Sequence, residues 1–149
     1  MNLEIVPYEE ALKNSLFEFT GECFRNIGKA FEPDGRHSFY NDIPGSFDSF
    51  WCLVEGSVVL GSVAIKKIGD GMCELKALYL SEVLRGQGWG YKLLDTAVSY
   101  ARATGYKRVV LDSMSQYKDA RRLYDRYGFT VTDRYNDNIY ADVFMEYVL

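Results

Sequence analysis

The stretch Arg85-Gly86-Gln87-Gly88-Trp89-Gly90 decides the fold of this chain. It follows a strand-like run from Glu74 to Leu80 and precedes an amphipathic helix that begins at about Gly88. Three glycines in five residues allow the backbone to approach a ligand closely, and the helix start offers unpaired N–H groups and the positive end of a dipole. The stretch therefore predicts a phosphate or pyrophosphate site.

Length and composition are those of one ordinary globular domain. The chain has 149 residues, of which 48% are hydrophobic and 26% charged, so residues 1–149 are expected to form a single domain. The net charge of −4 argues against a nucleic-acid-binding protein, because such proteins usually present a basic face. No metal site is expected, since Cys23, Cys52 and Cys73 match neither a zinc motif nor a disulfide framework.

Two further features bear on the compartment. The longest uncharged apolar run, from Ser57 to Ile65, is far shorter than the roughly 20 residues that cross a membrane. The first residues lack the basic and apolar blocks of a secretory signal. We therefore expect a cytoplasmic protein with reduced cysteines and no membrane partner.

Hydrophobic periodicity predicts strands and helices in a mixed α/β order. Gly105 and Gly128 are placed to end two of the helices. The expected strands are residues 3–8, 49–54, 57–67, 72–80, 108–112, 129–135 and 139–149, and the expected helices are residues 9–27, 88–104 and 118–127. The last two strands are expected to form a closing hairpin, and residues 28–47 a loop with a short helix that opens onto the active site or covers it.

The chain resembles the GNAT superfamily of N-acetyltransferases. One signature of that family is present as Arg85-x-x-Gly88-x-Gly90, and a second as the run from Ala120 to Phe129, which reads Ala-x-x-Leu-Tyr-x-x-x-Gly-Phe. The resemblance covers residues 50–149 well and the first 50 only by element order. It implies a mixed α/β fold: a central, mostly antiparallel sheet of six to seven strands, splayed around the cofactor and flanked by about four helices.

The resemblance also implies acetyl-coenzyme A as cosubstrate and no metal. The pantetheine arm would lie along the strand end formed by Leu78, Tyr79 and Leu80. The pyrophosphate would lie on the glycine loop and the helix start behind it, formed by Arg85, Gly86, Gln87, Gly88, Trp89, Gly90 and Tyr91.

Tyr124 is the first candidate catalytic side chain. In many members of the family the matching tyrosine protonates the departing thiolate, and a phenol can act as a general acid. Spacing alone would favour a different interpretation, an aromatic residue on the core face of its helix. The family motif reverses that preference.

Glu74 is the second candidate. An amine with a pKa near 10.4 is free base in only about one molecule in 2,500 at pH 7, so a group must remove its proton. In related enzymes a glutamate six residues before the end of this strand does so, directly or through water, and Glu74 precedes Leu80 by six. The alternative is a strand residue paired with Lys76 or Lys67, and the sequence leaves both open.

A dinucleotide-binding fold is the main rival, because strand, Gly86-x-Gly88, helix, strand and Asp112 imitate its fingerprint. We reject it, since Tyr91 occupies the third glycine position and hairpins precede the loop. Asp112 is then a strand-end or helix-entry residue. Tyr117 stands where the family often has an asparagine, which leaves the exact cofactor contacts open, and His37 is expected at the surface.

The interpretation we adopt is acetyl transfer from acetyl-coenzyme A to a primary amine by direct attack, on a small molecule or a peptide amino group. The loop acids Glu32, Asp34 and Asp42 and the aromatic residues Tyr135 and Tyr140 are expected to attract a cationic amine. A non-catalytic coenzyme A-binding or regulatory module on the same fold is the alternative. The oligomeric state stays open, a homodimer included.

Overall fold

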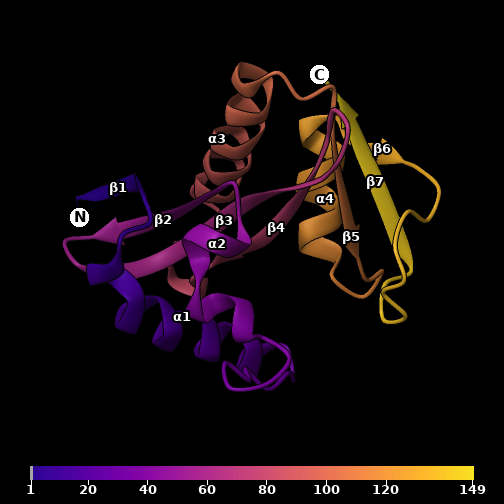
Figure 1. Cartoon of the computed structure of the whole chain (residues 1–149). Helices are drawn as coiled ribbons and strands as arrows, with labels where there is room; N and C mark the ends of the chain where they lie inside the picture. The colour runs from indigo at the N-terminus through magenta and orange to yellow at the C-terminus, as the bar shows by residue number, and fades with distance from the viewer. Residues whose placement is uncertain (1) are drawn as a thin grey trace.

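The computed structural model describes residues 2–149, which form a seven-stranded sheet with four α-helices. The predicted mixed α/β architecture is confirmed (Figure 1). The strands are β1 (Leu3–Pro7), β2 (Ser49–Glu55), β3 (Val58–Gly69), β4 (Met72–Leu80), β5 (Arg108–Ser113), β6 (Thr130–Val131) and β7 (Val143–Val148). The helices are α1 (Lys13–Asn26), α2 (Ile43–Ser46), α3 (Trp89–Thr104) and α4 (Lys118–Tyr127), with 3-10 turns at Glu10–Leu12, Ser38–Asn41 and Glu82–Leu84.

The strand order is β1-β2-β3-β4-β5-β7-β6, and every neighbouring pair is antiparallel except β4 and β5. The parallel pairing of β4 with β5 joins only Met72 to Arg108, Cys73 to Val109 and Glu74 to Val110. β5 continues to Ser113 against β7, while β4 continues to Leu80 against β3. The two strands therefore separate after Glu74, and the sheet opens in the middle.

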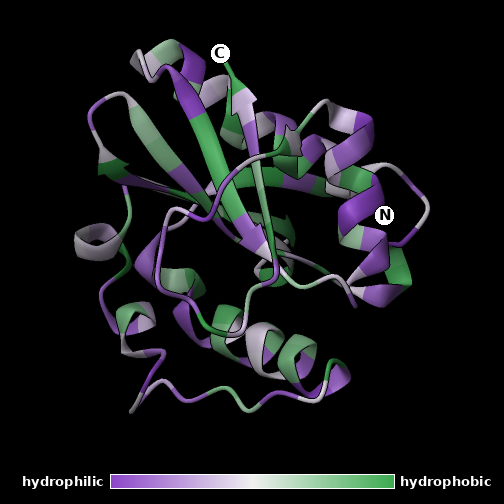
Figure 2. Cartoon of the chain, turned by 90° about the vertical axis from the view of Figure 1, so that its right-hand side faces the viewer, coloured by the Kyte–Doolittle hydropathy of each residue, from purple (hydrophilic) through white to green (hydrophobic). Residues whose placement is uncertain are grey.

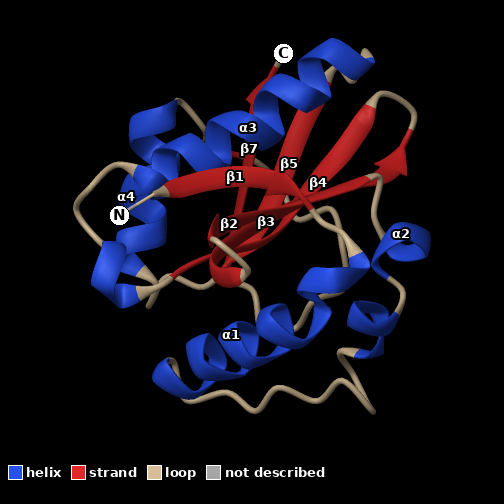
Figure 3. Ribbon diagram, turned by 90° about the vertical axis from the view of Figure 1, so that its left-hand side faces the viewer, coloured by secondary structure: helices blue, strands red, loops and turns tan. Residues whose placement is uncertain are grey.

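Side chains alternate between two cores along the central strands. On β2, Trp51 and Leu53 face the cluster that contains α3 and α4, whereas Phe50, Cys52 and Val54 face the cluster that contains α1 and the aromatic residues of the following loop. Figure 3 shows α3 and α1 on opposite faces of the sheet. Figure 2 shows apolar and polar residues side by side along the helices, as amphipathic helices with one buried face require.

The closing hairpin is shorter than predicted. The expected strand 129–135 reduces to β6, and the expected strand 139–149 begins only at Val143. Between them, polar side chains bond to the loop itself: the guanidinium of Arg134 donates to the carbonyl oxygens of Asn138 and Ala141 at 2.9 and 3.0 Å. The side chain of Asn138 accepts from the Tyr140 N–H at 3.1 Å. Such local bonds compete with a β ladder.

Within residues 2–149, no helix combines the length and the apolar character that a membrane crossing requires.

Candidate active site

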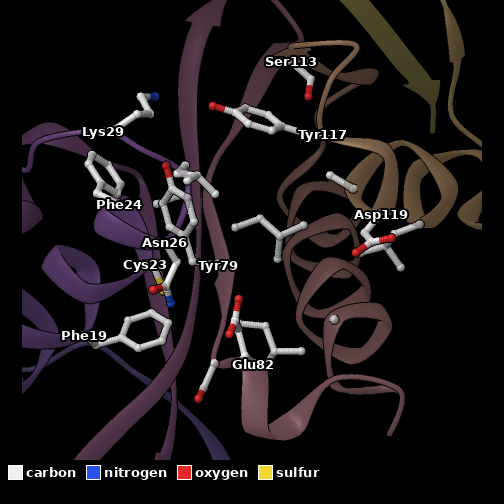
Figure 4. A pocket seen from close by; sticks show the side chains of 18 of the residues that line it. Phe19, Cys23, Phe24, Asn26, Lys29, Tyr79, Glu82, Ser113, Tyr117 and Asp119 are labelled. Atoms are coloured by element: carbon white, nitrogen blue, oxygen red, sulfur yellow. The ribbon is translucent and has the colours of Figure 1, made fainter.

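A cavity of about 2000 Å³ occupies the opening between β4 and β5. Ordinary small-molecule pockets measure roughly 300–1,000 Å³, so this one has room for a cofactor and a second substrate. Figure 4 shows its two walls: Phe19, Cys23, Phe24, Asn26 and Lys29 lie on one side, and Ser113, Tyr117 and Asp119 on the other. Tyr79 of β4 lies between the walls.

A bulge in β4 shapes the floor of the cavity. The register with β3 shifts between Lys76 and Tyr79, and Ala77 takes a φ of 56°, a left-handed conformation that costs a non-glycine residue energy. The fully buried hydroxyl of Ser62 donates to the Ala77 carbonyl oxygen at 2.6 Å. Because C=O and N–H point in opposite directions across a trans peptide, this bond turns the Leu78 N–H away from Ser62.

The glycine loop leads into α3 as predicted. Gly86 and Gly88 have φ values of 78° and 86°, which favour glycine because it lacks a Cβ. A Cβ at either position would have no other part of the chain within 4 Å, so backbone conformation alone requires these glycines. Gly88 is the N-cap of α3 and makes no side-chain cap, so the first N–H groups of this helix are left for solvent or a ligand.

Most of the predicted cofactor-binding residues line the cavity. Those on its surface are Leu78, Tyr79, Leu80, Arg85, Gly86, Gly88, Gly90 and Tyr91. The side-chain amide of Gln87 instead donates to the Val83 carbonyl oxygen at 3.4 Å. The Lys92 ammonium lies over the Trp89 ring, 4.3 Å from the ring centroid. Neither side chain is placed to contact a ligand in the cavity, although their backbone groups belong to the loop.

Arg85 and Gly90 connect this loop to α4. The Arg85 guanidinium donates to the Asp119 carboxylate at 3.0 Å. A Cβ at Gly90 would lie 3.3 Å from a methyl carbon of Leu123, so the glycine permits close approach of the two helices. The positive end of α3 and the second wall are therefore held together.

Tyr124 lies on α4, where it is buried and also lines the cavity. Its ring packs beside Phe129 at 5.9 Å between centroids. Burial, and secondarily the Asp112 carboxylate, raises the pKa of Tyr124 to about 12. The phenol is therefore protonated at neutral pH. Tyr124 therefore packs in the core and also faces the cavity, so its catalytic role stays a prediction.

Glu74 is buried behind the cavity and is not among the residues that line it. Its carboxylate accepts from the Tyr135 hydroxyl at 2.6 Å and from the Asn136 amide at 3.3 Å. It also pairs with the Lys76 ammonium at 3.2 Å. The sequence offered two interpretations of Glu74, a base or a strand residue paired with a lysine, and the ion pair with Lys76 is the one that the second predicts.

Asp112 is the cavity residue that sequence reasoning missed. It lines the cavity at the end of β5, where β4 has already separated. The same Asn136 amide that reaches Glu74 donates to Asp112 at 2.6 Å, and the Asn138 amide donates at 3.4 Å. The signal in the sequence was an acidic residue near the end of a short buried strand.

The expected acidic rim is wrong. Among residues 2–149, Glu32, Asp34 and Asp42 are absent from the cavity lining, and the same loop contributes Lys29, Arg36 and His37 instead. Glu32 pairs with Arg36 at 2.9 Å, and Asp42 caps α2 by accepting from the Gly45 N–H.

Two other side chains of this rim, those of His37 and Tyr135, also lie differently from expectation, whereas Tyr140 lines the cavity as expected. His37 packs against Phe24 at 5.1 Å, and burial, followed by Arg36, lowers the pKa of His37. Tyr135 is turned to Glu74, whereas the exposed Tyr140 lines the cavity. Hydrogen bonds and an ion pair thus engage Glu32, Asp42 and Tyr135 outside the cavity.

Comparisons with known proteins agree with this geometry. Residues 13–129 match the model of the acetyltransferase (GNAT) family. An uncharacterized N-acetyltransferase of Schizosaccharomyces pombe is 36% identical over 85 residues, which cover 56% of this chain and 52% of that protein. The chain thus matches about half the length of this relative.

Two solved structures show the same fold. An acetyltransferase from Streptococcus agalactiae superposes with a TM-score of 0.87 at 23% identity, covering 99% of this chain and 98% of that one. The PaiA N-acetyltransferase from Thermoplasma acidophilum, solved in complex with coenzyme A, superposes with a TM-score of 0.82 at 21% identity over the whole of both chains. The present chain has the sequence motifs and the split sheet described above, and it matches the family model over most of its length. It therefore belongs to the GNAT family of acetyltransferases.

Proposed function

We propose that the protein transfers the acetyl group of acetyl-coenzyme A to a primary amine in a ternary complex. The observation that carries the proposal is the order of groups along one cavity. The uncapped start of α3, the Asp112 carboxylate, Leu78 and Tyr124 all lie on its lining. Figure 4 shows Ser113, the neighbour of Asp112, at the opposite end from Glu82, which precedes the glycine loop. This order matches a donor that is anionic at one end and an acceptor that is cationic before it reacts.

The cofactor end would bind the pyrophosphate through backbone N–H groups of the first turn of α3. A helix start favours an anion by about 0.3–1 kcal/mol at the surface and more when partly buried. Arg85 is the first residue of the same loop and also lines the cavity. The pantetheine arm would lie along Leu78 to Leu80, whose edge β5 has left free. The PaiA structure, which shares this fold, was solved in complex with coenzyme A, and this supports coenzyme A as the ligand.

The acyl step needs a donor for the oxyanion. The amine nitrogen attacks the thioester carbonyl carbon, and the negative charge that develops on the carbonyl oxygen would be met by the Leu78 N–H. Ser62 fixes that group by holding the Ala77 carbonyl. The C–S bond then breaks, and the thiolate takes the proton of the Tyr124 hydroxyl. Burial raises the pKa of Tyr124, and it would raise the pKa of a thiolate beside it for the same reason, so transfer stays feasible.

The amine must lose a proton as the new C–N bond forms. Glu74 was the expected acceptor, but three donors hold its carboxylate behind the cavity. Asp112 faces the cavity and is joined to Glu74 through Asn136. We therefore propose that the Asp112 carboxylate accepts the proton that the amine loses. Glu74 is then a positioning residue, which orients Asp112 through Asn136.

Release of free thiol tests the proposed function. The protein is incubated with acetyl-coenzyme A and a panel of primary amines, and free coenzyme A is followed together with the acetylated amine. We expect amine-dependent release that Tyr124→Phe suppresses. Tight binding of acetyl-coenzyme A by calorimetry, without turnover on any amine, would instead indicate the non-catalytic module.

A further inference from the structure

The acceptor end of the cavity holds a cation and an anion on opposite walls. Lys29 follows α1 on one wall, and Asp112 lies near the end of β5 on the other. Neither side chain takes part in an ion pair among residues 2–149. The two charges nevertheless act on each other: burial and then Arg36 lower the pKa of Lys29, while the Asp112 carboxylate raises it. They are within electrostatic reach without being in contact.

Lys29 is held in place although it has no acidic partner. Its ammonium lies over the Phe24 ring at 5.3 Å from the centroid, and the side chain is half-buried. Figure 4 shows the ammonium end at the same end of the cavity as the Tyr117 hydroxyl and Ser113 of the opposite wall. Two further cations of the lining are already compensated, Arg36 by Glu32 at 2.9 Å and Lys76 by Glu74 at 3.2 Å, and Lys118, next to Tyr117, is exposed to water.

Asp112 is in the converse position. Its hydrogen-bond donors are the neutral amides of Asn136 and Asn138, so they orient the carboxylate without cancelling its charge. Glu74, the neighbouring carboxylate, is compensated by Lys76. Other charged residues of the lining have no ionic partner in residues 2–149 either, but Glu18, Glu22, Lys118 and Arg126 are exposed to water. Among the described residues, Lys29 and Asp112 are thus the uncompensated cation and anion of the cavity that are partly removed from water.

We propose that the acceptor is a small zwitterion of the amino-acid type, with its amine on Asp112 and its carboxylate on Lys29. A partly buried charge without a partner is costly, and a molecule that carries both counter-charges relieves both sites at once. A simple amine would leave Lys29 without a partner, and a polyamine would place a second cation beside it, which is repulsive. The inference rests on the proposed function, because it names the class of amine that the same site acetylates.

The experiment compares matched acceptors. A panel of amino acids is tested beside the corresponding amides and the corresponding decarboxylated amines, with 1,4-diaminobutane added, and kcat/KM is expressed per free amine. We expect each preferred amino acid to exceed its amide by at least about tenfold, since a charge-assisted hydrogen bond is about twice as strong as a neutral one. The diamine should be the poorest acceptor.

Variants assign that preference to Lys29. Lys29→Gln should lower kcat/KM for the amino acid about tenfold and leave the amide within about twofold, while Lys29→Arg should retain most of the preference. Lys13→Gln is the control, because Lys13 also lies over a phenylalanine ring, that of Phe17 at 5.7 Å, but does not line the cavity. Thermal unfolding of each variant establishes that it is folded.

The outcomes separate this inference from the proposed function. Equal use of amino acids and amides, or an equal loss for both in Lys29→Gln, overturns the zwitterion and leaves the acetyltransferase standing. If no acceptor is acetylated, calorimetry of amino acids with the coenzyme A-loaded protein decides the inference alone. Binding that Lys29→Gln abolishes then supports the site, and absence of binding overturns it.

Discussion

The two ends of the cavity are built in different ways. The proposed cofactor end is one contiguous segment, residues 85–91, in which backbone groups and backbone conformation would form the site. The proposed acceptor end is assembled from side chains that lie far apart in the sequence: Lys29 after α1, Lys76 on β4, Asp112 on β5 and Tyr140 before β7. All four residues line the cavity in the opening between β4 and β5, two strands that Figure 1 shows side by side in the sheet.

This difference indicates how each end of the cavity can be altered while the function of the other end is retained. A backbone site depends on a few local φ values and on the helix behind them. A side-chain site depends on which charged groups are left unpaired after the rest have found partners. Substitutions at the cofactor end should therefore change coenzyme A affinity, whereas substitutions at the acceptor end should change acceptor choice and pH dependence.

The largest effect is expected where the two ends meet, at Tyr124. Tyr124→Phe keeps the ring beside Phe129 and removes only the hydroxyl. Turnover should fall by about 10²–10⁴ with little change in acetyl-coenzyme A affinity. Because the pKa of Tyr124 is raised to about 12, the phenol stays protonated, and the ratio of variant to wild-type rate should be constant up to about pH 10.

Tyr127→Phe is the matched control on the same helix. Its hydroxyl donates to Asp95 at 2.7 Å and lies outside the cavity lining, so the variant should lose some stability and retain turnover. A loss below about threefold in Tyr124→Phe would leave Tyr124 as a packing residue only.

Asp112→Asn tests whether Asp112, and not Glu74, accepts the proton of the amine. Removing the proton acceptor should lower kcat/KM by about 10² at pH 7. The rate should recover in part as the pH approaches the pKa of the amine, where free base is available without help. Glu74→Gln should cost less and stay in constant ratio to wild type, because Tyr135 and Asn136 still hold the side chain. If kcat/KM falls in a pH-dependent way in Glu74→Gln and not in Asp112→Asn, Glu74 is the proton acceptor and Asp112 is not.

Gly90→Glu tests the cofactor end alone. A carboxylate at the start of α3 opposes the pyrophosphate, and we expect acetyl-coenzyme A affinity by calorimetry to fall by roughly 10- to 100-fold, about 1.4 kcal/mol for each factor of ten. Gly90→Ala is the control, since it brings the same Cβ against Leu123 without the charge. Gly88 is a poorer choice because its φ of 86° would strain any side chain. Equal acetyl-coenzyme A affinities for Gly90→Glu and Gly90→Ala would mean that the pyrophosphate does not bind at this helix start.

The smallest effect is expected at the bulge beneath both ends. Ser62→Ala leaves the Ala77 carbonyl without its hydroxyl donor, and we expect turnover to fall about three- to tenfold and stability to fall by about 1–3 kcal/mol. Ala77→Gly accepts the same φ at no steric cost and should keep turnover with equal or greater stability. Unchanged turnover in Ser62→Ala would mean that the Leu78 N–H does not depend on this bond.

Most of the fold followed from local pattern. Alternation along residues 49–80 predicted β2, β3 and β4, and helical spacing with terminal glycines predicted α3 and α4 to within a residue or two. The closing hairpin was overestimated, because Tyr135 and Asn136 look like strand and turn residues, and their bonds to Glu74 and Asp112 cannot be read from their neighbours.

The sequence by itself determined the glycine loop, the start of α3 and the tyrosine of α4, because glycines with positive φ and helix periodicity are local properties. Only the tertiary structure decided which acid faces the cavity. Glu74 and Asp112 are equivalent as isolated carboxylates, and we propose different roles for them because Lys76 and Tyr135 reach Glu74 and not Asp112. The same holds for the loop, where Glu32 is paired with Arg36 and Lys29 is left to face the cavity. Charge pairing depends on distances between segments, and those distances exist only after the sheet has formed and opened.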